Sequence, residues 1–396
     1  MKLARRLQAI KPSPTLALNS RAKALAAKGV DVVVLAAGEP DFDTPDYVKQ
    51  AAVDALRAGF TKYTATNGIP ELREAICAKL ERDNGLRYTP DQVLVTSGGK
   101  QALYNFCQAA LEEGDEVIIF SPFWVSYPDM VRLAGATPVI VPTREEDGFA
   151  PAPDAIRRAL TPNTRAVIIN SPGNPTGAVY SRAALEAIAE VLRPHDCLIV
   201  TDDIYERLLY TDERLGISDV APDLVPRLVV VNGMSKAYSM TGWRLGYIAG
   251  PKPLVSAMQM VQDQSTSNAS SIGQKAALAA LQGPPDTIAS MVKEYRERRD
   301  FFVAGLNALD GVRCRMPEGA FYAFADVRGL LGRSYKGKPV ASAMQLSEIL
   351  LDDFRVAAVP GEPFGAEGYI RMSFVTSREV LQKGLTRLGE LVKALS

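Results

Sequence analysis

Residues 228–246 read LVVVNGMSKAYSMTGWRLG. The stretch begins with a continuous apolar run that ends at Asn232 and gives way to a loop of glycine and polar residues. An uninterrupted run rich in β-branched residues is typical of a strand buried on both faces of a parallel sheet. The loop that follows carries Lys236 and Arg244. Because ligands in open α/β sheets bind beyond the carboxyl ends of the strands, we expect chemistry in this loop.

Similar runs alternate with amphipathic stretches from about residue 46 onward. The runs are QVLVTS (92–97), EVIIF (116–120), TPVIV (137–141), RAVIIN (165–170), CLIVTD (197–202), LVVVN (228–232) and LGYIAG (245–250). Strands that alternate with helical stretches indicate a mainly parallel sheet with helices packed on each side. The sequence therefore predicts an α/β fold with a large domain built on about seven strands.

The pattern changes after residue 250, where a long helical stretch at 286–309 is long enough to link two domains. Beyond it the sequence predicts a smaller α+β unit with a final helix from about 378 to 394. Its expected strands are FYAFAD (321–326), RVAAV (355–359) and YIRMSFV (369–375). We predict a large domain over 46–296 and a discontinuous small domain over 1–45 and 297–396, which includes an N-terminal arm.

The composition argues against several classes of protein. The 45 basic and 45 acidic residues give a formal net charge of zero, whereas nucleic-acid and anionic-membrane binders carry a basic excess. The single histidine, His195, excludes poly-His metal sites and argues against a Ser/His/Asp or Cys/His site. The four cysteines form no CxxC pair, and the N-terminus does not read as a signal peptide, so we expect reduced thiols in a cytoplasmic protein with no metal and no membrane span.

Two predicted strand ends carry residues that fit an anion and a cation. Ser97-Gly98-Gly99-Lys100 opens a helix, where glycines and free N–H groups could cradle a phosphate, although such turns also carry glycine for backbone geometry alone. Asp202 ends the run CLIVTD. A buried carboxylate needs a partner, which is either a protein group such as an arginine or a ligand cation such as a protonated pyridine nitrogen.

Two further strand ends point to a defined loop and a reactive amine. The irregular turn Asn170 to Gly177 is dense in Asn, Pro and Gly, which fixes its backbone and aims an amide into the cleft. Lys236 follows a buried strand, where partial burial and nearby positive charge would lower the pKa of its amine. A lysine of this kind can act as a nucleophile and form a Schiff base.

Taken together, these segments resemble the class I aminotransferases, which have fold type I and use pyridoxal 5′-phosphate (PLP). Residues 233–246 match the whole pyridoxal-lysine signature of that class. Further matches are AAGEPDFDTP (36–45), TKYT (61–64), GIPELREAI (68–76), SGGKQAL (97–103), FWVSY (123–127), NSPGNPTG (170–177), TDDIYE (201–206) and YIRMSF (369–374). The chain is most similar to the prokaryotic subgroup of aspartate aminotransferases, some members of which also accept prephenate.

The resemblance implies roles around the cofactor ring. Lys236 would hold PLP as an aldimine and carry the proton between the substrate α-carbon and the cofactor. Asp202 would pair with the pyridinium nitrogen, and Tyr205 and Asn174 would donate to the ring oxygen O3′. Trp124 would stack on the ring, although an aromatic residue after a strand is by itself more typical of a core.

The resemblance also implies a phosphate site and a dimer. Gly98, Gly99, Lys100, Ser235 and Arg244 would hold the phosphate, while Gly233 stands where family members often carry a hydroxyl residue. Tyr63 would reach the phosphate bound in a neighbouring subunit, which implies a homodimer with shared sites.

For the substrate, the resemblance assigns the α-carboxylate to Arg371 and the Gly38 backbone, with Trp124 and Asn174 close by. Residues 262–268 lack the arginine that other aspartate aminotransferases use for a distal carboxylate. Lys100 and the segment around Thr15 would bind that group instead. Lys11 matches a lysine of prephenate-using relatives. Without the resemblance, Lys11 is an ordinary basic residue of an exposed arm.

The implied activity is a ping-pong transfer of an amino group between aspartate or glutamate and 2-oxoglutarate or oxaloacetate, with prephenate as a further acceptor. Alternatives stay open at this point. The same motif serves aminotransferases for aromatic or other amino acids and PLP-dependent lyases or synthases. A PLP-sensing transcriptional regulator would need a basic winged-helix extension, and an α/β nucleotide-binding domain would bind no PLP.

Overall fold

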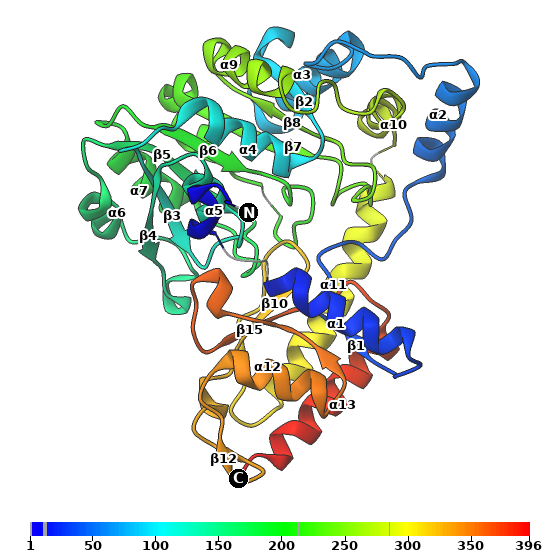
Figure 1. The fold of residues 1–396 in the computed structure, drawn as a ribbon, viewed down its shortest axis with the longest axis vertical. Coiled ribbons are helices and arrows are strands. Elements are labelled where there is room, and N and C mark those ends of the chain that lie inside the picture. Colours follow the sequence, from blue (N-terminus) through cyan, green and yellow to red (C-terminus); the bar gives the residue numbers. More distant parts are fainter. Residues whose placement is uncertain (1, 11–13, 213, 285) are drawn as a thin grey trace.

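The computed structural model describes residues 2–10, 14–212, 214–284 and 286–396. Its main feature is a seven-stranded sheet with the order β2-β8-β7-β6-β5-β3-β4 (Figure 1). These strands are β2 (Val93–Thr96), β3 (Glu116–Ser121), β4 (Thr137–Pro142), β5 (Thr164–Ile169), β6 (Leu198–Asp202), β7 (Leu228–Gly233) and β8 (Gly246–Ala249). All seven predicted runs are therefore strands. Only β8 runs antiparallel to its neighbours, which confirms the predicted mainly parallel α/β fold.

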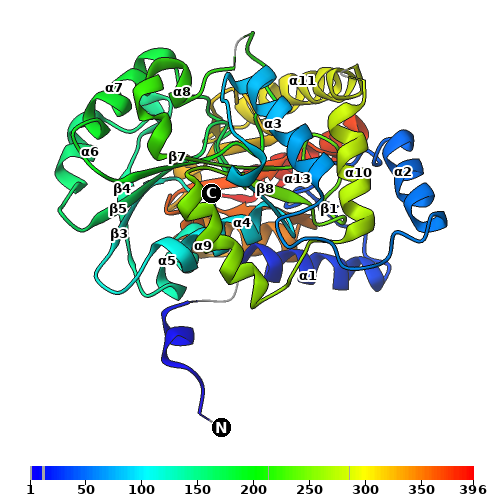
Figure 2. The ribbon, with the colours of Figure 1, turned by 90° about the horizontal axis from the view of Figure 1, so that it is seen from above.

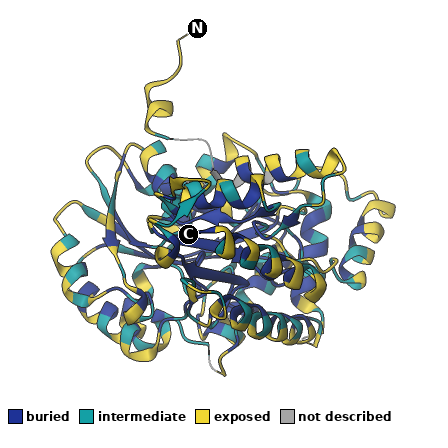
Figure 3. Ribbon diagram, turned by 90° about the horizontal axis from the view of Figure 1, so that it is seen from below, coloured by how far each residue is buried: buried dark blue, intermediate teal, exposed yellow. Residues whose placement is uncertain are grey.

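Helices cover both faces of this sheet, which explains why its strands are apolar throughout. Along β7, Val229 and Val231 pack into a cluster with α4 (Gly99–Ala110) and α9 (Lys252–Asp263). Val230 faces the opposite side and packs with residues of the helices there. Figure 3 shows the buried strands between exposed outer helix faces. The other helices of this part are α2 (Asp46–Arg57), α3 (Pro70–Asn84), α5 (Tyr127–Leu133), α6 (Pro153–Ala159), α7 (Arg182–Leu192), α8 (Ile217–Val220) and α10 (Ser271–Gln282).

A second, smaller sheet lies beside the first and has the order β14-β15-β10-β9. Its strands are β9 (Arg313–Cys314), β10 (Tyr322–Asp326), β14 (Val359–Pro360) and β15 (Tyr369–Ser373). The helices α11 (Asp286–Asn307), α12 (Ala343–Asp352) and α13 (Arg378–Ala394) pack around it (Figure 1). The hairpin β11 (Ser334–Tyr335) and β12 (Lys338–Pro339) completes this part.

The prediction of one strand over RVAAV was wrong, because this segment divides between two sheets. β13 (Val356–Ala357) pairs in parallel with β1 (Val33–Val34), whereas β14 pairs with β15. The chain thus changes partner at Ala358, and Pro360 has no N–H with which to extend the second ladder.

The start of the chain lies against the C-terminal part. Val33 and Leu35 share a buried cluster with residues of α11 and α13. Helix α1 (Pro14–Ala27) packs its Leu18 and Ala22 against Phe364 and its neighbours. Before it, the short helix η1 (Arg5–Ala9) lies next to α5, and the chain before η1 extends outward in Figure 2. We keep the boundaries 46–296 and 1–45 with 297–396 as a prediction.

The structure also places the single histidine and the four cysteines. His195 lies in a bend after α7, and Cys77, Cys107, Cys197 and Cys314 are free thiols. Within the described ranges, no helix has the length and apolar character needed to cross a membrane. The same part of the chain holds no group of three or more His, Cys, Asp or Glu placed to bind a metal.

Candidate active site

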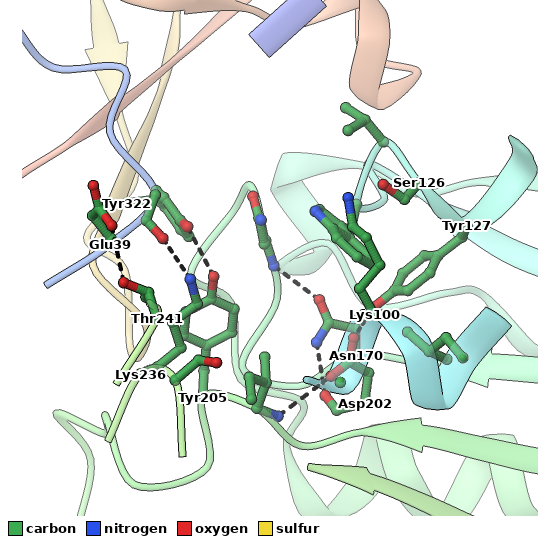
Figure 4. A pocket seen from close by; sticks show the side chains of 18 of the residues that line it. Glu39, Lys100, Ser126, Tyr127, Asn170, Asp202, Tyr205, Lys236, Thr241 and Tyr322 are labelled. Atoms are coloured by element: carbon green, nitrogen blue, oxygen red, sulfur yellow. Dashed lines mark hydrogen bonds between the residues drawn. The ribbon is translucent and has the colours of Figure 1, made fainter. Parts of the chain in front are cut away.

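The carboxyl ends of β5, β6 and β7 open into a cavity of about 480 Å³, and β15 of the small sheet closes its other side. Parallel strands bring their ends to one edge, so loops far apart in sequence meet there (Figure 4). Eleven of the predicted site residues line the cavity: Gly38, Gly99, Lys100, Trp124, Asn174, Asp202, Tyr205, Ser235, Lys236, Arg244 and Arg371.

Asp202 is buried at the end of β6. The hydroxyl of Tyr127 donates to its Oδ2 at 2.6 Å, and the backbone N–H of Ile204 contacts Oδ1 at 3.4 Å. Burial raises the pKa of the Asp202 carboxyl, and the hydrogen bond from Tyr127 partly offsets this. Among the described residues no Lys or Arg forms an ion pair with it. Of the two partners considered for this carboxylate, a ligand cation is the one that the geometry leaves room for.

Lys236 is half-buried in the loop after β7, opposite Asp202 (Figure 4). Its Nζ donates to the backbone oxygen of Gly38 and lies 5.9 Å from the centre of the Tyr205 ring. Burial, followed by the positive charges of Arg371 and Arg244, lowers the pKa of the Lys236 amine to about 8. Near neutral pH an amine with this pKa has a far larger neutral, nucleophilic fraction than an ordinary lysine.

Arg371 is buried on β15, and no carboxylate of the described residues pairs with it. Its Nη1 donates to Asn174 Oδ1 at 3.0 Å and its Nη2 donates to the Ala36 oxygen at 3.1 Å, while Nε has no partner among the described residues. The guanidinium lies between two rings, with its carbon 4.4 Å from the centre of Tyr322 and 5.1 Å from that of Phe364. A buried, uncompensated guanidinium is costly, and a planar carboxylate from a ligand would neutralise it.

The first turn of α4 and Arg244 form an anion cradle. Gly98 has φ +88°, and a Cβ there would come within 2.5 Å of Arg244 Nη2, so only glycine lets the arginine approach this turn. Similarly, a Cβ on Gly246 would lie 2.4 Å from the N of Gly99. Arg244 is held by a 2.7 Å hydrogen bond from Nη1 to the Thr241 oxygen. Free N–H groups at a helix start together with a guanidinium suit a phosphate group.

An aromatic wall faces this cradle. The Nζ of Lys100 lies 4.9 Å above the Trp124 ring, and Trp124 packs edge-on against Tyr127 with the ring centres 5.3 Å apart. Burial and the nearby charge of Arg244 lower the pKa of the Lys100 amine. This wall offers a flat surface next to Asp202 on which an aromatic ring can stack.

Four predicted site residues lie elsewhere or outside the description. Gly98 does not line the cavity but packs against Arg244 behind it. Tyr63 is 92% exposed and contributes nothing to the cavity within this chain. Lys11 lies outside the described residues, as does the side chain of Thr15.

Sequence reasoning missed three residues that organise the site. Tyr127 binds Asp202, Asn170 Nδ2 donates to the Asp202 backbone oxygen at 2.8 Å, and the hydroxyl of Tyr322 lies 2.8 Å from that of Tyr205 (Figure 4). Tyr127 and Asn170 fall within segments already singled out, FWVSY and NSPGNPTG. The run FYAFAD gave no sign that Tyr322 would face the cavity, because the partner strand and the register decide this.

Fold and site together define an aminotransferase of class I and II. The model of the family described as "Aminotransferase class I and II" matches residues 30–388, and the chain belongs to this family. It is 48% identical to the aspartate/prephenate aminotransferase of Nitrosomonas europaea, over 99% of this chain and 100% of the relative. It is 49% identical to that of Thermus thermophilus, over 98% of each chain.

Solved structures agree with this. The aspartate aminotransferase of Rhizobium meliloti superimposes with a TM-score of 0.96 at 44% identity, over 100% of both chains. The aspartate aminotransferase of Thermus thermophilus with maleate superimposes with a TM-score of 0.92 at 47% identity, over 99% of this chain and 100% of the other. The chain is therefore an enzyme, an aminotransferase with the fold-type I architecture that the sequence predicted.

Proposed function

We propose that the enzyme uses PLP and that PLP attaches to Lys236. One observation carries this proposal: a half-buried lysine with a pKa of about 8 lines the same cavity as a buried carboxylate, Asp202, which forms no ion pair with a Lys or Arg of the described residues. The cradle of Gly98, Gly99 and Arg244 supplies an anion site in the same cavity region. Aldehyde, pyridine nitrogen and phosphate are the three groups that such a set of residues suits.

The surrounding residues would hold the cofactor from all sides. Arg244, Ser235, Lys100 and the N–H groups at the start of α4 would bind the phosphate. Asp202 would keep the pyridine nitrogen protonated, since a carboxylate in a buried site favours a proton or cation beside it. Tyr127 and Asn170 would keep Asp202 in position through the 2.6 Å and 2.8 Å hydrogen bonds. Trp124 would stack on the ring, and Tyr205 and Asn174 would lie near its hydroxyl edge.

When bound, PLP supplies an electron sink that stabilises negative charge at the substrate α-carbon. The protein supplies the base, because Lys236 Nζ can take the α-proton and give it back within a closed site. No histidine is needed for this, and His195 lies away from the cavity. Arg371 orients the substrate by gripping its α-carboxylate, with the Gly38 backbone beside it.

We infer that the substrates are dicarboxylic amino acids and 2-oxo acids, namely aspartate or glutamate with oxaloacetate or 2-oxoglutarate, and prephenate in addition. The names of the relatives support this, because those at 46–50% identity are aspartate/prephenate aminotransferases. The lining of the cavity supports dicarboxylic substrates, because it has more basic than acidic residues. Lys100, Thr15 and Lys11 are the residues proposed for the distal carboxylate.

We further propose a homodimer with shared sites. Tyr63 is a large aromatic residue that is 92% exposed in the single chain. Aromatic side chains are enriched at protein–protein interfaces, where a partner removes their apolar surface from water. Its hydroxyl would bind the phosphate in the partner subunit's cavity. The four free thiols fit a reducing compartment, and we propose the cytoplasm.

The direct test of the cofactor proposal is replacement of Lys236 by Ala. The purified wild-type protein should show a visible chromophore that borohydride fixes covalently to the chain. Lys236→Ala should lose the fixed label, and peptide mapping of the wild type should place it on Lys236. A label that is unchanged in Lys236→Ala would overturn the assignment.

Product analysis distinguishes an aminotransferase from a PLP-dependent lyase with the same fold. With aspartate and 2-oxoglutarate, transamination gives stoichiometric glutamate and oxaloacetate. Fumarate and ammonia released from aspartate, with no glutamate formed, would indicate a lyase. Glutamate formation therefore decides between the two activities.

A further inference from the structure

Helix α1 brings a positive charge to the cavity from the small-domain side. Ser20 and Lys23, three residues apart and thus on one face of the helix, both line the cavity. The rotation of the helix is fixed by its other faces. Leu18 and Ala22 are buried in the cluster around Phe364, and Arg21 pairs with Asp352 at 2.7 Å.

The cavity holds more positive than negative groups. Its cations are Lys23, Lys100, Lys236, Arg244 and Arg371, and its only acidic residues in the described part of the chain are Glu39 and Asp202. Glu39 accepts a 2.9 Å hydrogen bond from Thr241, so it already has a partner. An excess of this size suits a cofactor phosphate and a substrate with more than one carboxylate.

Four of these cations are already engaged. Lys236 donates to Gly38, Arg371 to Asn174 and Ala36, and Arg244 to Thr241, while Lys100 lies over the Trp124 ring. Lys23 forms no hydrogen bond or ion pair with any described residue. Among the described cations of the cavity, Lys23 is therefore the one whose ammonium has no hydrogen-bond, ion-pair or ring contact within the chain and to which no cofactor or substrate group has been assigned.

We propose that Lys23, with the hydroxyl of Ser20 beside it, determines specificity by binding the distal carboxylate of a dicarboxylic substrate whose α-carboxylate lies on Arg371. This inference rests on the proposed function and adds a residue to those suggested for the distal group. Lys23 lies on a helix whose position is set by packing, so its charge is held at the cavity mouth even before a ligand arrives. As an exposed lysine it acts as a point charge and contributes modestly.

The experiment measures binding of two inert probes, succinate and propionate, to the holoenzyme by the change in its visible absorbance. Lys23→Ala should weaken succinate binding about threefold to fivefold, the range expected of an exposed ion pair, and leave propionate binding unchanged. Lys23→Arg should keep succinate affinity close to the wild-type value. High salt should shrink the difference between wild type and Lys23→Ala, because solvent-exposed charges are screened.

Lys28→Ala is the matched control, since Lys28 is an exposed lysine that follows the same helix and does not line the cavity. It should bind both probes as the wild type does. Unchanged succinate binding in Lys23→Ala, or equal weakening of succinate and propionate, would overturn the role of Lys23 while leaving the proposed function intact. If the wild type binds succinate no better than propionate, the dicarboxylate specificity fails and Lys23 fails with it.

Discussion

At the scale of single residues, the cavity gathers charged groups that the described residues leave without full partners. Solvent is largely excluded from Lys236, Asp202 has no ion pair with a described Lys or Arg, and Arg371 Nε has no hydrogen-bond partner among the described residues. Each is costly in isolation, and in the proposed function each meets a different group of cofactor or substrate. Residues with perturbed pKa values that line one cavity favour a functional site there.

The pKa of Lys236 predicts how the apoprotein captures PLP with pH. Burial lowers the pKa from 10.5 to about 8, so the amine is protonated below that pH and neutral above it. The rate of PLP capture, followed by absorbance in a stopped-flow instrument, should rise up to about pH 8 and then level off. A rate that keeps rising to pH 10 would show an ordinary lysine.

Arg371→Lys is expected to impair substrate binding rather than cofactor binding. Lysine keeps the charge but loses the planar fork that meets a carboxylate with two parallel hydrogen bonds. The kcat/KM for aspartate should fall about tenfold to a hundredfold, which corresponds to about 1.5–3 kcal/mol for a charged hydrogen bond. The dissociation constant of PLP should stay unchanged, whereas Arg244→Lys should raise it. Equal effects of both variants on PLP would contradict the division of roles.

At the scale of elements, a buried ion network ties α3 to the ends of β6 and β7. Glu206, next to Tyr205, pairs with Lys79 and accepts hydrogen bonds from Asn84 at 2.8 Å and Asn232 at 2.7 Å. Arg214 contacts the same carboxylate at 3.3 Å. Burial alone would raise the pKa of Glu206, but Lys79 and Arg214 outweigh it and hold the pKa below its usual value. This network connects the strand ends that carry Tyr205 and Lys236.

Glu206→Gln should destabilise the protein strongly, because it leaves the Lys79 ammonium buried without its counterion. The expected loss is about 3–5 kcal/mol, measured by urea unfolding. The double variant Lys79→Met with Glu206→Gln should lose less than the sum of the single variants. Arg21→Ala, which breaks an exposed pair with Asp352, is the control and should cost less than about 1 kcal/mol. A Glu206→Gln loss as small as that of the control would contradict the account.

At the scale of the whole molecule, two sheets from different parts of the chain form one cavity, and a second subunit is proposed to complete it. Arg371 reaches the cavity from β15, whereas Asp202 and Lys236 reach it from β6 and β7. Tyr63 is placed outside the cavity of its own chain. If the site is shared, a hybrid dimer of two defective subunits can contain one intact site, because each subunit supplies the residue that the other lacks.

Tyr63→Phe should dimerise as the wild type does but bind PLP more weakly. When Tyr63→Phe is refolded together with Lys236→Ala, each hybrid dimer contains one intact site, with Tyr63 from one subunit and Lys236 from the other. Tight PLP binding should return at that site, as measured by titration of the separated hybrid. The shared site would be contradicted if the wild-type protein sediments as a monomer, or if the hybrid binds PLP no more tightly than Tyr63→Phe.

The sequence predicted those parts of the fold that local patterns determine. Continuous apolar runs located all seven strands of the main sheet, and the last helix was placed at 378–394. RVAAV was predicted as one strand because nothing in it shows that its two halves pair with β1 and β15. The contact of Tyr322 with Tyr205 and the approach of Lys23 to the cavity depend likewise on long-range packing. Motif matching named most of the residues that line the cavity, whereas their contacts could be read only from the structure.

The most direct test of the central claim is a two-step turnover of the holoenzyme, with aspartate in excess over the sites in the first step and removed before the second. Aspartate alone should give one oxaloacetate per subunit and then stop. Addition of 2-oxoglutarate should give one glutamate per subunit and restore the original absorbance. Steady release of ammonia from aspartate alone, or no oxaloacetate in the first step, would contradict a PLP-dependent aminotransferase for dicarboxylic substrates.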